Sequence, residues 1–562
     1  MNSDQPATPS TPSLVEKIAW AVVIVVTLAV CYFSNLGAIG FVGPDEPRYA
    51  WIARAMAESG DWVTPRLYGK PWFEKPPLYY WMAGASFKMF GVGEVTARLP
   101  SALCALYATL ALAWLALRFY GEETARWLLL LLPTSVGMIG FSHAAATDMP
   151  FSAMLTIAMV CAAVILGLTR NESTPILPHT PWLALFLFGF FLGLAVLAKG
   201  PAAIVLTGGG VIFWALFTKR WRDAFRLLHP VAIASFCLTA LPWYILCAGR
   251  NPDFFRVFII EHNFKRYLTP EFQHIQPFWY YVPVILVELL PWSLIGVGAF
   301  LGWCLGKSRF DISEKTSFVS SWALFCVVFF SVSQSKLPGY ILPAFPAFVL
   351  LASIALSSSR RILSRMNIAG ALAGGTIFTI IGLLPLVISS RRNSFVALPV
   401  VGALFAAFGI ANLIAAGALR NRSLALANKP LQLLAAVPVL FLFAGVNKAV
   451  NHHWFWAKSP RSIAASLISE KIPAQQLRTF RLKRDVQYAL SFYLHREVAD
   501  WDGNPISDGY VLTDGRPCER LNSQSNCQVV WGRRDSGDAI WSLLRITPSS
   551  SANGTAHSGE MR

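Results

Sequence analysis

Residues 182–198 read WLALFLFGFFLGLAVLA, a run without a charged side chain. A helix of about 17–25 apolar residues crosses the hydrocarbon core of a bilayer, so this run predicts a membrane-spanning helix. Other runs of spanning length recur along the chain: Ile18–Phe33, Val95–Phe119, Trp127–Ala146, Met149–Leu168, Ala202–Phe217, Pro230–Cys247, Phe278–Leu305, Phe318–Val332, Pro338–Leu356, Ile368–Ile388, Val396–Leu419 and Leu431–Val446. The sequence therefore predicts a polytopic α-helical membrane protein with about thirteen transmembrane helices.

The composition of the 562-residue chain agrees with lipid as its solvent. Hydrophobic residues make up 55% and charged residues 14% of the chain, and its mean hydropathy is +0.50. Soluble domains carry about a quarter charged residues, which excludes a soluble multidomain protein. The net charge of +17 has two interpretations, namely basic cytoplasmic loops or an anionic partner such as lipid phosphate. Membrane lipids are expected partners, and nucleic acid is not.

The positions of the basic residues predict the orientation in the membrane. Clusters of Lys and Arg follow the even-numbered predicted spans: Arg118 and Arg126; Lys219, Arg220, Arg222 and Arg226; Lys307, Arg309 and Lys315; Arg360, Arg361 and Arg365; Arg420, Arg422 and Lys429. The positive-inside rule places these loops and the N-terminus in the cytoplasm. With an odd number of spans, the C-terminal tail lies on the outer face. The charge excess is therefore largely topological.

The pattern changes after Val446. Ser459–Glu470 predicts a helix with Ser459 as N-cap and Pro460 at the first helical position. Strand-like runs at 479–482, 509–513 and 528–531, with a helix at 485–494, predict a small α/β domain. We therefore expect a transmembrane domain at 1–448, an outer α/β domain at 449–548 and a disordered tail at 549–562. A Cys518–Cys527 disulfide fits this tail if it lies outside the cytoplasm.

Two outer loops, 36–94 and 249–277, are long for connections between spans, and such loops are usually functional. The first begins Gly43-Pro-Asp-Glu-Pro-Arg-Tyr49. In one interpretation Asp45 or Glu46 caps an interfacial helix that starts at Pro47 and ends at Ser59-Gly60. In the other, the two carboxylates beside Arg48 and Tyr49 belong to a catalytic site. The interpretations are compatible, because a cap fixes a carboxylate in place.

The same loop continues Trp72-Phe-Glu-Lys-Pro-Pro-Leu-Tyr-Tyr-Trp81. An aromatic belt at the membrane surface explains the rings. The functional alternative is that Glu74 ligates a divalent cation while Lys75 holds a phosphate.

Further charged residues stand at the ends of predicted spans. Asp148 follows the third span, where a lone Asp is often a turn residue, and Lys199 interrupts two apolar runs, where a charge usually lines a cavity. Glu288 is a similar charge without an evident partner. The second long loop contains Glu261-His-Asn-Phe-Lys-Arg-Tyr267, in which His262 is either structural or a metal ligand and Arg266 a phosphate contact. Ser335-Lys-Leu-Pro-Gly-Tyr340 adds another Lys and Tyr.

The pattern of these residues carries more information than any member. Under the predicted topology Lys75, Lys199, Lys265, Arg266 and Lys336 lie at the outer membrane level, where the positive-inside rule predicts none. Carboxylates lie in the same layer. Cations that bind phosphate beside carboxylates that bind a metal or sugar hydroxyls predict an outward-facing enzyme acting on phosphorylated lipids.

These motifs occur in an order that resembles one family. Gly43–Tyr49, Phe73-Glu-Lys-Pro-Pro-Leu78, Arg98-Leu-Pro-Ser101, Thr147-Asp148, Lys199-Gly-Pro201 and Ser335–Tyr340 are similar to motifs of the polyprenyl-phosphate-dependent GT-C glycosyltransferases, and most similar to the bacterial lipid A aminoarabinose transferases. The resemblance implies a multi-pass protein of the bacterial inner membrane with a periplasmic C-terminal domain. It also implies transfer of 4-amino-4-deoxy-L-arabinose from undecaprenyl phosphate to lipid A phosphates, which protects against polymyxin-like cationic peptides.

The resemblance implies a central catalytic Asp at Asp45 and a divalent metal (Zn²⁺, Mg²⁺ or Mn²⁺) at Glu74 and His262. Because a phosphate acceptor is already ionised near neutral pH, Asp45 is expected to orient a substrate or meet positive charge on the sugar, whereas a hydroxyl acceptor would need it as base. The candidate residues are Asp45, Glu46 and Asp148 for catalysis, Arg48, Tyr49, Lys75, Lys199, Arg266, Lys336 and Tyr340 for substrate binding, and Glu74 and His262 for metal.

Two other functions remain open from sequence. A related GT-C transferase would move another sugar to a protein or glycan hydroxyl. A transporter of lipid-linked sugars would distribute charge through the bilayer and contain repeated spans, which the sequence does not show.

Overall fold

The computed structural model describes residues 13–168, 181–265, 275–290, 292–293, 314–358, 459–514, 526–535 and 538–548, with isolated positions between 376 and 413. The predicted spans 368–388, 396–419 and 431–446, and the second half of 278–305, lie essentially outside the described residues. The predicted total of thirteen spans is therefore not tested.

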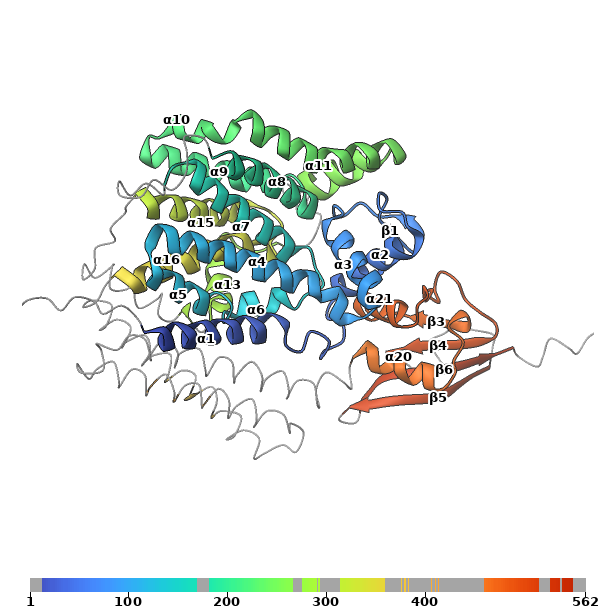
Figure 1. Cartoon of the computed structure of the whole chain (residues 1–562). Coiled ribbons are helices and arrows are strands. Elements are labelled where there is room, and N and C mark those ends of the chain that lie inside the picture. Colours follow the sequence, from blue (N-terminus) through green and yellow to red (C-terminus); the bar gives the residue numbers. More distant parts are fainter. Residues whose placement is uncertain are drawn as a thin grey trace, which may run out of the picture.

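Helices of different lengths lie side by side in a bundle (Figure 1). They are α1 (Leu14–Phe33), α4 (Glu94–Tyr120), α5 (Glu122–Leu131), α6 (Val136–Ser142), α7 (Asp148–Ile165), α8 (Trp182–Lys199), α9 (Ala202–Thr218), α11 (Pro230–Arg250), α13 (Tyr281–Glu288), α15 (Glu314–Val332) and α16 (Phe345–Ser358). Helix α7 is central, because every residue from Met149 to Ile165 is buried, and it packs against α4 and α8. Among the described residues, α4, α7, α8 and α11 are long and apolar enough to cross a membrane.

The predicted span 127–146 is not one straight helix. It consists of α5 and α6, which meet at 62°. Pro133 lies in the break, where it cannot donate the backbone hydrogen bond that a continuous helix requires. The indole Nε1 of Trp292 donates to Thr134 Oγ1 (2.9 Å), and the backbone N–H of Val136 donates to Leu290 O (3.0 Å). These contacts satisfy polar groups that the break exposes.

Smaller elements occupy the two ends of the bundle (Figure 1). Helix α10 (Trp221–Ala224) and the 3₁₀ turn η1 (Phe225–Leu228) lie at one end. At the opposite end lie α2 (Asp45–Ser59), the β1–β2 hairpin (Arg66–Leu67, Lys70–Pro71) and α3 (Leu78–Phe90). The chain also forms the π-helical stretch η2 (Arg256–Lys265) and the 3₁₀ turns η4 (Pro338–Tyr340) and η5 (Leu342–Ala344).

Helix α2 begins earlier than the sequence predicts. Its first residue is Asp45, its N-cap is Pro44, and no side chain caps it, so the expected capping role of Asp45 or Glu46 is wrong. Pro47 is instead the third helical residue, where its missing N–H costs nothing because the first N–H groups of a helix have no intrahelical acceptor. The end is as predicted, since Gly60 has φ 74° and donates its N–H to Met56 O.

The C-terminal elements form a four-stranded sheet with two helices. Strands β3 (Leu477–Phe480), β4 (Gly509–Thr513), β6 (Asp538–Thr547) and β5 (Asn526–Asp535) lie in that spatial order, with β3 and β4 parallel and the other pairs antiparallel. Helix α20 (Pro460–Ser469) has Ser459 as N-cap, as predicted. Helix α21 (Arg484–Tyr493) packs on α2. The turn η8 (Ala474–Gln476) precedes β3. Cys527 is disulfide-bonded, and Cys518 lies outside the described residues.

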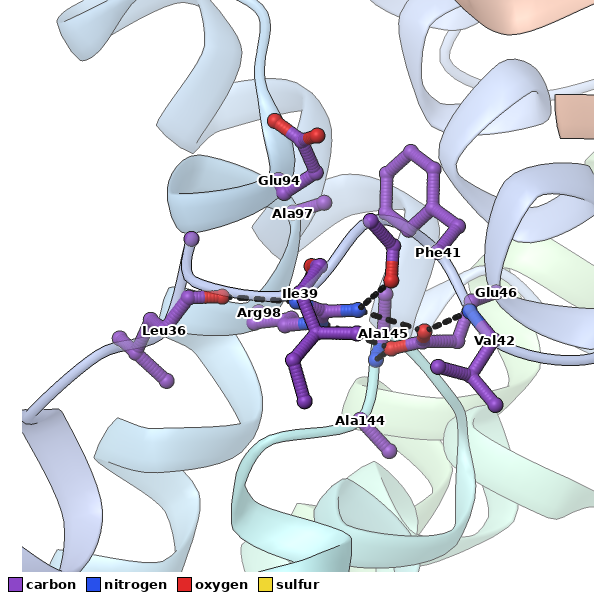
Figure 2. Close-up of polar contacts among 12 residues, drawn as sticks. Leu36, Ile39, Phe41, Val42, Glu46, Glu94, Ala97, Arg98, Ala144 and Ala145 are labelled. Atoms are coloured by element: carbon purple, nitrogen blue, oxygen red, sulfur yellow. Dashed lines mark hydrogen bonds and ion pairs between the residues drawn. The ribbon is translucent and has the colours of Figure 1, made fainter. Parts of the chain in front are cut away.

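A buried ion pair joins these parts of the fold (Figure 2). Arg98 of α4 donates from Nε and Nη2 to the two carboxylate oxygens of Glu46, at 2.9 and 2.7 Å. Its remaining N–H groups donate to the carbonyls of Leu36 (2.8 Å), Ile39 (2.7 Å) and Gly40 (3.0 Å). All five guanidinium donors are therefore used.

Glu46 is equally well satisfied. Its carboxylate also accepts the backbone N–H of Val42 and of Ala145, each at 2.7 Å. The side chains of Arg98 and Glu46 are 5% and 8% exposed. The network thus connects the chain after α1, the first turn of α2, α4 and the turn between α6 and α7.

We expect Glu46→Ala to lower the free energy of unfolding by about 3–5 kcal/mol, because removing one partner leaves the Arg98 charge buried and unpaired. A Glu46→Leu/Arg98→Met double variant should lose less than Glu46→Ala. SDS titration of the purified protein in mixed micelles measures both. Glu122→Ala, which removes an exposed pair with Arg126, is the control and should cost about 0–1 kcal/mol. An equal effect of Glu46→Ala and Glu122→Ala would contradict the network's importance.

Candidate functional site

A first group of charged side chains lies where α2 begins. Arg48 Nη2 lies 2.5 Å from Asp45 Oδ1 and 3.1 Å from Glu74 Oε2. Lys75 Nζ lies 3.7 Å from the other oxygen of Glu74. The short β1–β2 hairpin brings Glu74 back to α2, since Tyr68 and Gly69 both adopt the positive φ of a tight turn. The structure therefore brings together four residues from two of the predicted motifs.

Exposure distinguishes the members of this group. The side chain of Asp45 is 54% exposed, whereas those of Arg48, Glu74 and Lys75 are 13%, 10% and 12% exposed. Packing against protein atoms raises the pKa of the Asp45 carboxyl, and Arg48 opposes this shift. Because Asp45 is half exposed, pairs with Arg48 and is influenced by the charge of Lys75, we expect a carboxylate at neutral pH that a ligand can reach.

Tyr49 is not placed to contact a ligand directly. Its side chain is buried and packs on Tyr79 and Tyr80. The guanidinium of Arg48 lies 5.1 Å from the Tyr49 ring centroid and 5.4 Å from that of Trp72. These contacts hold Arg48 in place, so the structure gives Tyr49 a supporting position rather than the predicted substrate contact.

A second group combines the ends of α7 and α8 with η4. Lys199, the last residue of α8, lies 2.5 Å from Asp148, the first residue of α7. The ammonium of Lys199 also lies 4.8 Å from the Tyr340 ring centroid and 5.4 Å from that of Phe151. A Cβ at Gly339 would approach Asp148 Oδ1 to 2.9 Å, so a glycine is needed for this close approach.

The two groups are neighbours. The charge of Asp148 contributes to raising the pKa of Asp45, as that of Glu74 does. The charges of Glu74 and Asp148 therefore both act on Asp45. Asp45 is the first residue of α2, which lies with α3 at one end of the bundle (Figure 1).

Lys336 and Glu288 differ from these groups in having no ion pair in the described part of the chain. Lys336 is 6% exposed and donates to Ser333 O (2.6 Å) and Gln276 O (3.0 Å). Removal from water lowers the pKa of Lys336. Glu288 is 7% exposed, and neither of its carboxyl oxygens has a hydrogen-bond partner among the described residues, which agrees with the absence of an evident partner in the sequence.

Glu74 and His262 line the same cavity, which has a volume of about 530 Å³. His262 reaches it from η2, and Trp72 and Phe73 form part of the wall. Among the described residues, no three His, Cys, Asp or Glu side chains are grouped as a metal site would need. One carboxylate and one imidazole fit a divalent site that substrate oxygens or water complete. Arg266 lies outside the described residues.

The cavity contains two cations that the sequence did not single out. Arg250 ends α11 and pairs with Asp61 at 3.3 Å, and Arg256 pairs with Glu261 at 2.7 Å. Both lie in the predicted outer loop 249–277, so the loop length was the signal that could have found them. The proximity of Arg250 and Arg256 to Glu74 could not be predicted from the sequence, because the cavity is lined by segments that are far apart in the chain.

Glu46 does not join Asp45 in this site. Its carboxylate is buried against Arg98 and points into the network of Figure 2. Of the two predicted catalytic carboxylates, Asp45 is therefore accessible, whereas Glu46 is buried and has a structural position. The remaining arrangement of cations beside carboxylates, part exposed and part desolvated, suits binding of an anionic phosphate ester.

Comparison with known proteins gives consistent matches. The sequence model of the family described as dolichyl-phosphate-mannose-protein mannosyltransferase matches residues 18–258. The undecaprenyl phosphate-α-4-amino-4-deoxy-L-arabinose arabinosyl transferase of Edwardsiella ictaluri is 32% identical over 60% of this chain and 59% of its own length. The same-named protein of Erwinia tasmaniensis is 29% identical over 80% of this chain and 83% of its own. The chain thus spans about 59% of the length of the first of these relatives.

The crystal structure of ArnT from Cupriavidus metallidurans bound to undecaprenyl phosphate is similar in fold, with a TM-score of 0.76 and 24% sequence identity. The match covers 93% of this chain and 98% of that chain. The apo form of the same protein matches with a TM-score of 0.73. The helical fold predicted from the sequence is thereby confirmed.

Proposed function

We propose that this chain is a polyprenyl-phosphate-dependent GT-C glycosyltransferase of the aminoarabinose transferase branch, and that it moves 4-amino-4-deoxy-L-arabinose from undecaprenyl phosphate to phosphate groups of lipid A. The observation that carries the proposal is the grouping of Asp45, Arg48, Glu74 and Lys75 beside the Asp148–Lys199 pair. The added aminosugar is cationic and would reduce binding of polymyxin-like peptides to lipid A.

The proposal includes a location and a topology. The chain would lie in the bacterial inner membrane with about thirteen spans and a cytoplasmic N-terminus. Residues 449–548 would form a periplasmic α/β domain, and the site would face the periplasm. The structure supports this arrangement because α10 and η1, which carry Arg222 and Arg226, lie at the bundle end opposite to α2 and α3 (Figure 1).

The proposed reaction is a direct displacement. An oxygen of the acceptor phosphate attacks the anomeric carbon, the bond from that carbon to the donor phosphate oxygen breaks, and undecaprenyl phosphate leaves with the electron pair. Configuration at the anomeric carbon inverts. Because the leaving group is a phosphate, charge neutralisation matters more than protonation. Lys75, Lys336 and Arg266 are the cations proposed for the donor phosphate, and Asp148, Lys199 and Tyr340 are proposed to form the wall beside the sugar.

Asp45 is proposed to face the sugar. It is the most exposed of the grouped carboxylates, and Arg48 and Lys75 favour its ionised form. A carboxylate there would stabilise the positive charge that develops on the sugar ring. Glu46 is proposed to act only by holding the first turn of α2.

A divalent metal is proposed at Glu74 and His262. Both side chains line one cavity, which is what a shared ion requires. The ion would supply a positive charge for the donor phosphate. Arg48 and Lys75 would hold the Glu74 carboxylate in place. Trp72 and Phe73, which line the same cavity, would exclude water from its apolar wall.

A second candidate function is transfer of a sugar to a hydroxyl. The match of residues 18–258 to the mannosyltransferase family favours it. A hydroxyl nucleophile must lose a proton, so Asp45 would then serve as the general base.

The direct test is transfer by the purified protein in lipid nanodiscs, with undecaprenyl phosphate-aminoarabinose as donor and lipid A as acceptor. We expect lipid A to gain one aminopentose on a phosphate, detected by mass spectrometry, with release of undecaprenyl phosphate. Dephosphorylated lipid A should remain unmodified. Transfer to the dephosphorylated acceptor would favour the hydroxyl alternative, and no transfer with either acceptor would reject the proposed function.

We expect Asp45→Asn to lower kcat for lipid A about 100-fold with little change in KM, because asparagine keeps the shape of aspartate and loses the charge that the transition state requires. Glu58→Gln, at the exposed end of the same helix, is the matched control and should keep full activity. The raised pKa of Asp45 also predicts that wild-type activity falls on acidification at a higher pH than for an ordinary aspartate. An Asp45→Asn enzyme that retains most of its activity would show that Asp45 is neither base nor charge stabiliser.

We expect the purified protein to contain one divalent metal ion per chain, measured by inductively coupled plasma mass spectrometry after exposure to Zn²⁺, Mn²⁺ and Mg²⁺. Glu74→Gln and His262→Ala should each lower the metal content at least tenfold, because each removes a proposed direct ligand, and even the loss of an outer-shell partner of a metal ligand typically costs about 10–100-fold in affinity. His495→Ala, in the C-terminal part, is the control. Equal metal content in all variants would contradict the assigned ligands.

A further inference from the structure

The loop that leads into α2 is held from two sides. On one side Arg98 of α4 binds the carbonyls of Leu36, Ile39 and Gly40. On the other side lie Ser459, Arg461 and Tyr493 of the C-terminal part. Arg461 Nη1 donates to Gly37 O at 3.0 Å, and a Cβ on Gly40 would meet Ser459 Oγ at 2.6 Å. The loop is therefore enclosed between the bundle and the C-terminal part.

The hydroxyl of Tyr493, the last residue of α21, lies at the centre of this contact. It accepts the backbone N–H of Phe41 at 3.0 Å and donates to Glu94 Oε1 at 3.0 Å. Glu94 is the first residue of α4, one helical turn before Arg98. A single hydroxyl group thus connects the C-terminal part, the loop and the helix that carries the buried ion pair.

Aromatic packing fixes the ring of Tyr493 around this hydroxyl. The Phe41 ring lies 5.9 Å from the Tyr493 ring and 4.8 Å from the Phe492 ring, and all three side chains are at least half buried. Burial also raises the pKa of the Tyr493 phenol, so the group keeps the proton that it donates to Glu94. The loop N–H of Phe41 therefore has a rigid acceptor.

The chain between Phe41 and Asp45 is short and is held at two points. Val42 donates its N–H to Glu46 at 2.7 Å, and Pro44, whose ring fixes φ, is the N-cap of α2. A restraint on the Phe41 backbone therefore also restrains the position of Asp45.

We propose that Tyr493 is a positioning residue through which the C-terminal part fixes the 37–45 loop and so the place of Asp45. Its effect on catalysis rests on the proposed function. The cause is geometric: a shift of about 1 Å in a group that faces the reacting atoms can cost up to about 100-fold in rate. No atom of Tyr493 needs to touch a substrate.

The test compares Tyr493→Phe with Tyr488→Phe in the full-length protein in nanodiscs. Tyr488 lies on the same helix α21 and packs its ring against Tyr68, 6.1 Å away, without a hydrogen bond to the loop. Tyr493→Phe keeps the ring contacts and removes the hydroxyl. We expect amide hydrogen exchange of the 37–45 segment to rise about tenfold in Tyr493→Phe and to stay unchanged in Tyr488→Phe.

With lipid A as acceptor, Tyr493→Phe should lower kcat about tenfold and leave KM within twofold, at an unchanged melting temperature. Unchanged exchange in the 37–45 segment overturns the proposal whatever the activity. Raised exchange with unchanged kcat in an active enzyme overturns it as well. If the wild type transfers no aminoarabinose, the proposed function fails separately, and the exchange difference between the two variants alone decides whether Tyr493 positions the loop.

Discussion

The structure depends on one buried ion pair, Arg98–Glu46. Moving each charge out of water costs several kcal/mol, and the pair is favourable only if every donor and acceptor is satisfied. Here all five guanidinium N–H groups and both carboxylate oxygens have partners. Because those partners come from the loop after α1, from α2 and from the α6–α7 turn, the pair fixes where α2 and α7 begin relative to α4 (Figure 2).

The placement of two helix starts explains the electrostatics of the candidate site. Asp45 is the first residue of α2, and Asp148 is the first residue of α7. The N-terminal end of a helix carries partial positive charge, which favours a carboxylate and equally favours an anionic ligand. Lys75 and Lys199 add full charges to the same region. The site therefore combines fixed dipoles and cations, the arrangement that a departing phosphate requires.

The sequence predicted the features that depend on local composition and left open those that depend on distant partners. Apolar runs located the bundle helices, and Ser459-Pro460 located the start of α20. Asp45 and Glu46 are adjacent in sequence, but successive helical residues point about 100° apart. The side chain of Asp45 is therefore exposed, whereas that of Glu46 is buried against Arg98. No local sequence pattern shows which of the two carboxylates is exposed. The Lys199–Asp148 pair spans 51 positions and the Tyr493–Phe41 contact 452, so only the folded chain shows them.

The two lysines that the sequence treated alike have different surroundings, and this separates their roles. Lys199 lies 2.5 Å from Asp148, and its ammonium lies near two aromatic rings. Its charge is therefore already neutralised by Asp148 at a largely buried position. Lys75 lies 3.7 Å from Glu74, beyond hydrogen-bond distance. An incoming phosphate would have to break a short ion pair to engage Lys199. Lys199 is thus better suited to hold Asp148 in place than to bind a ligand.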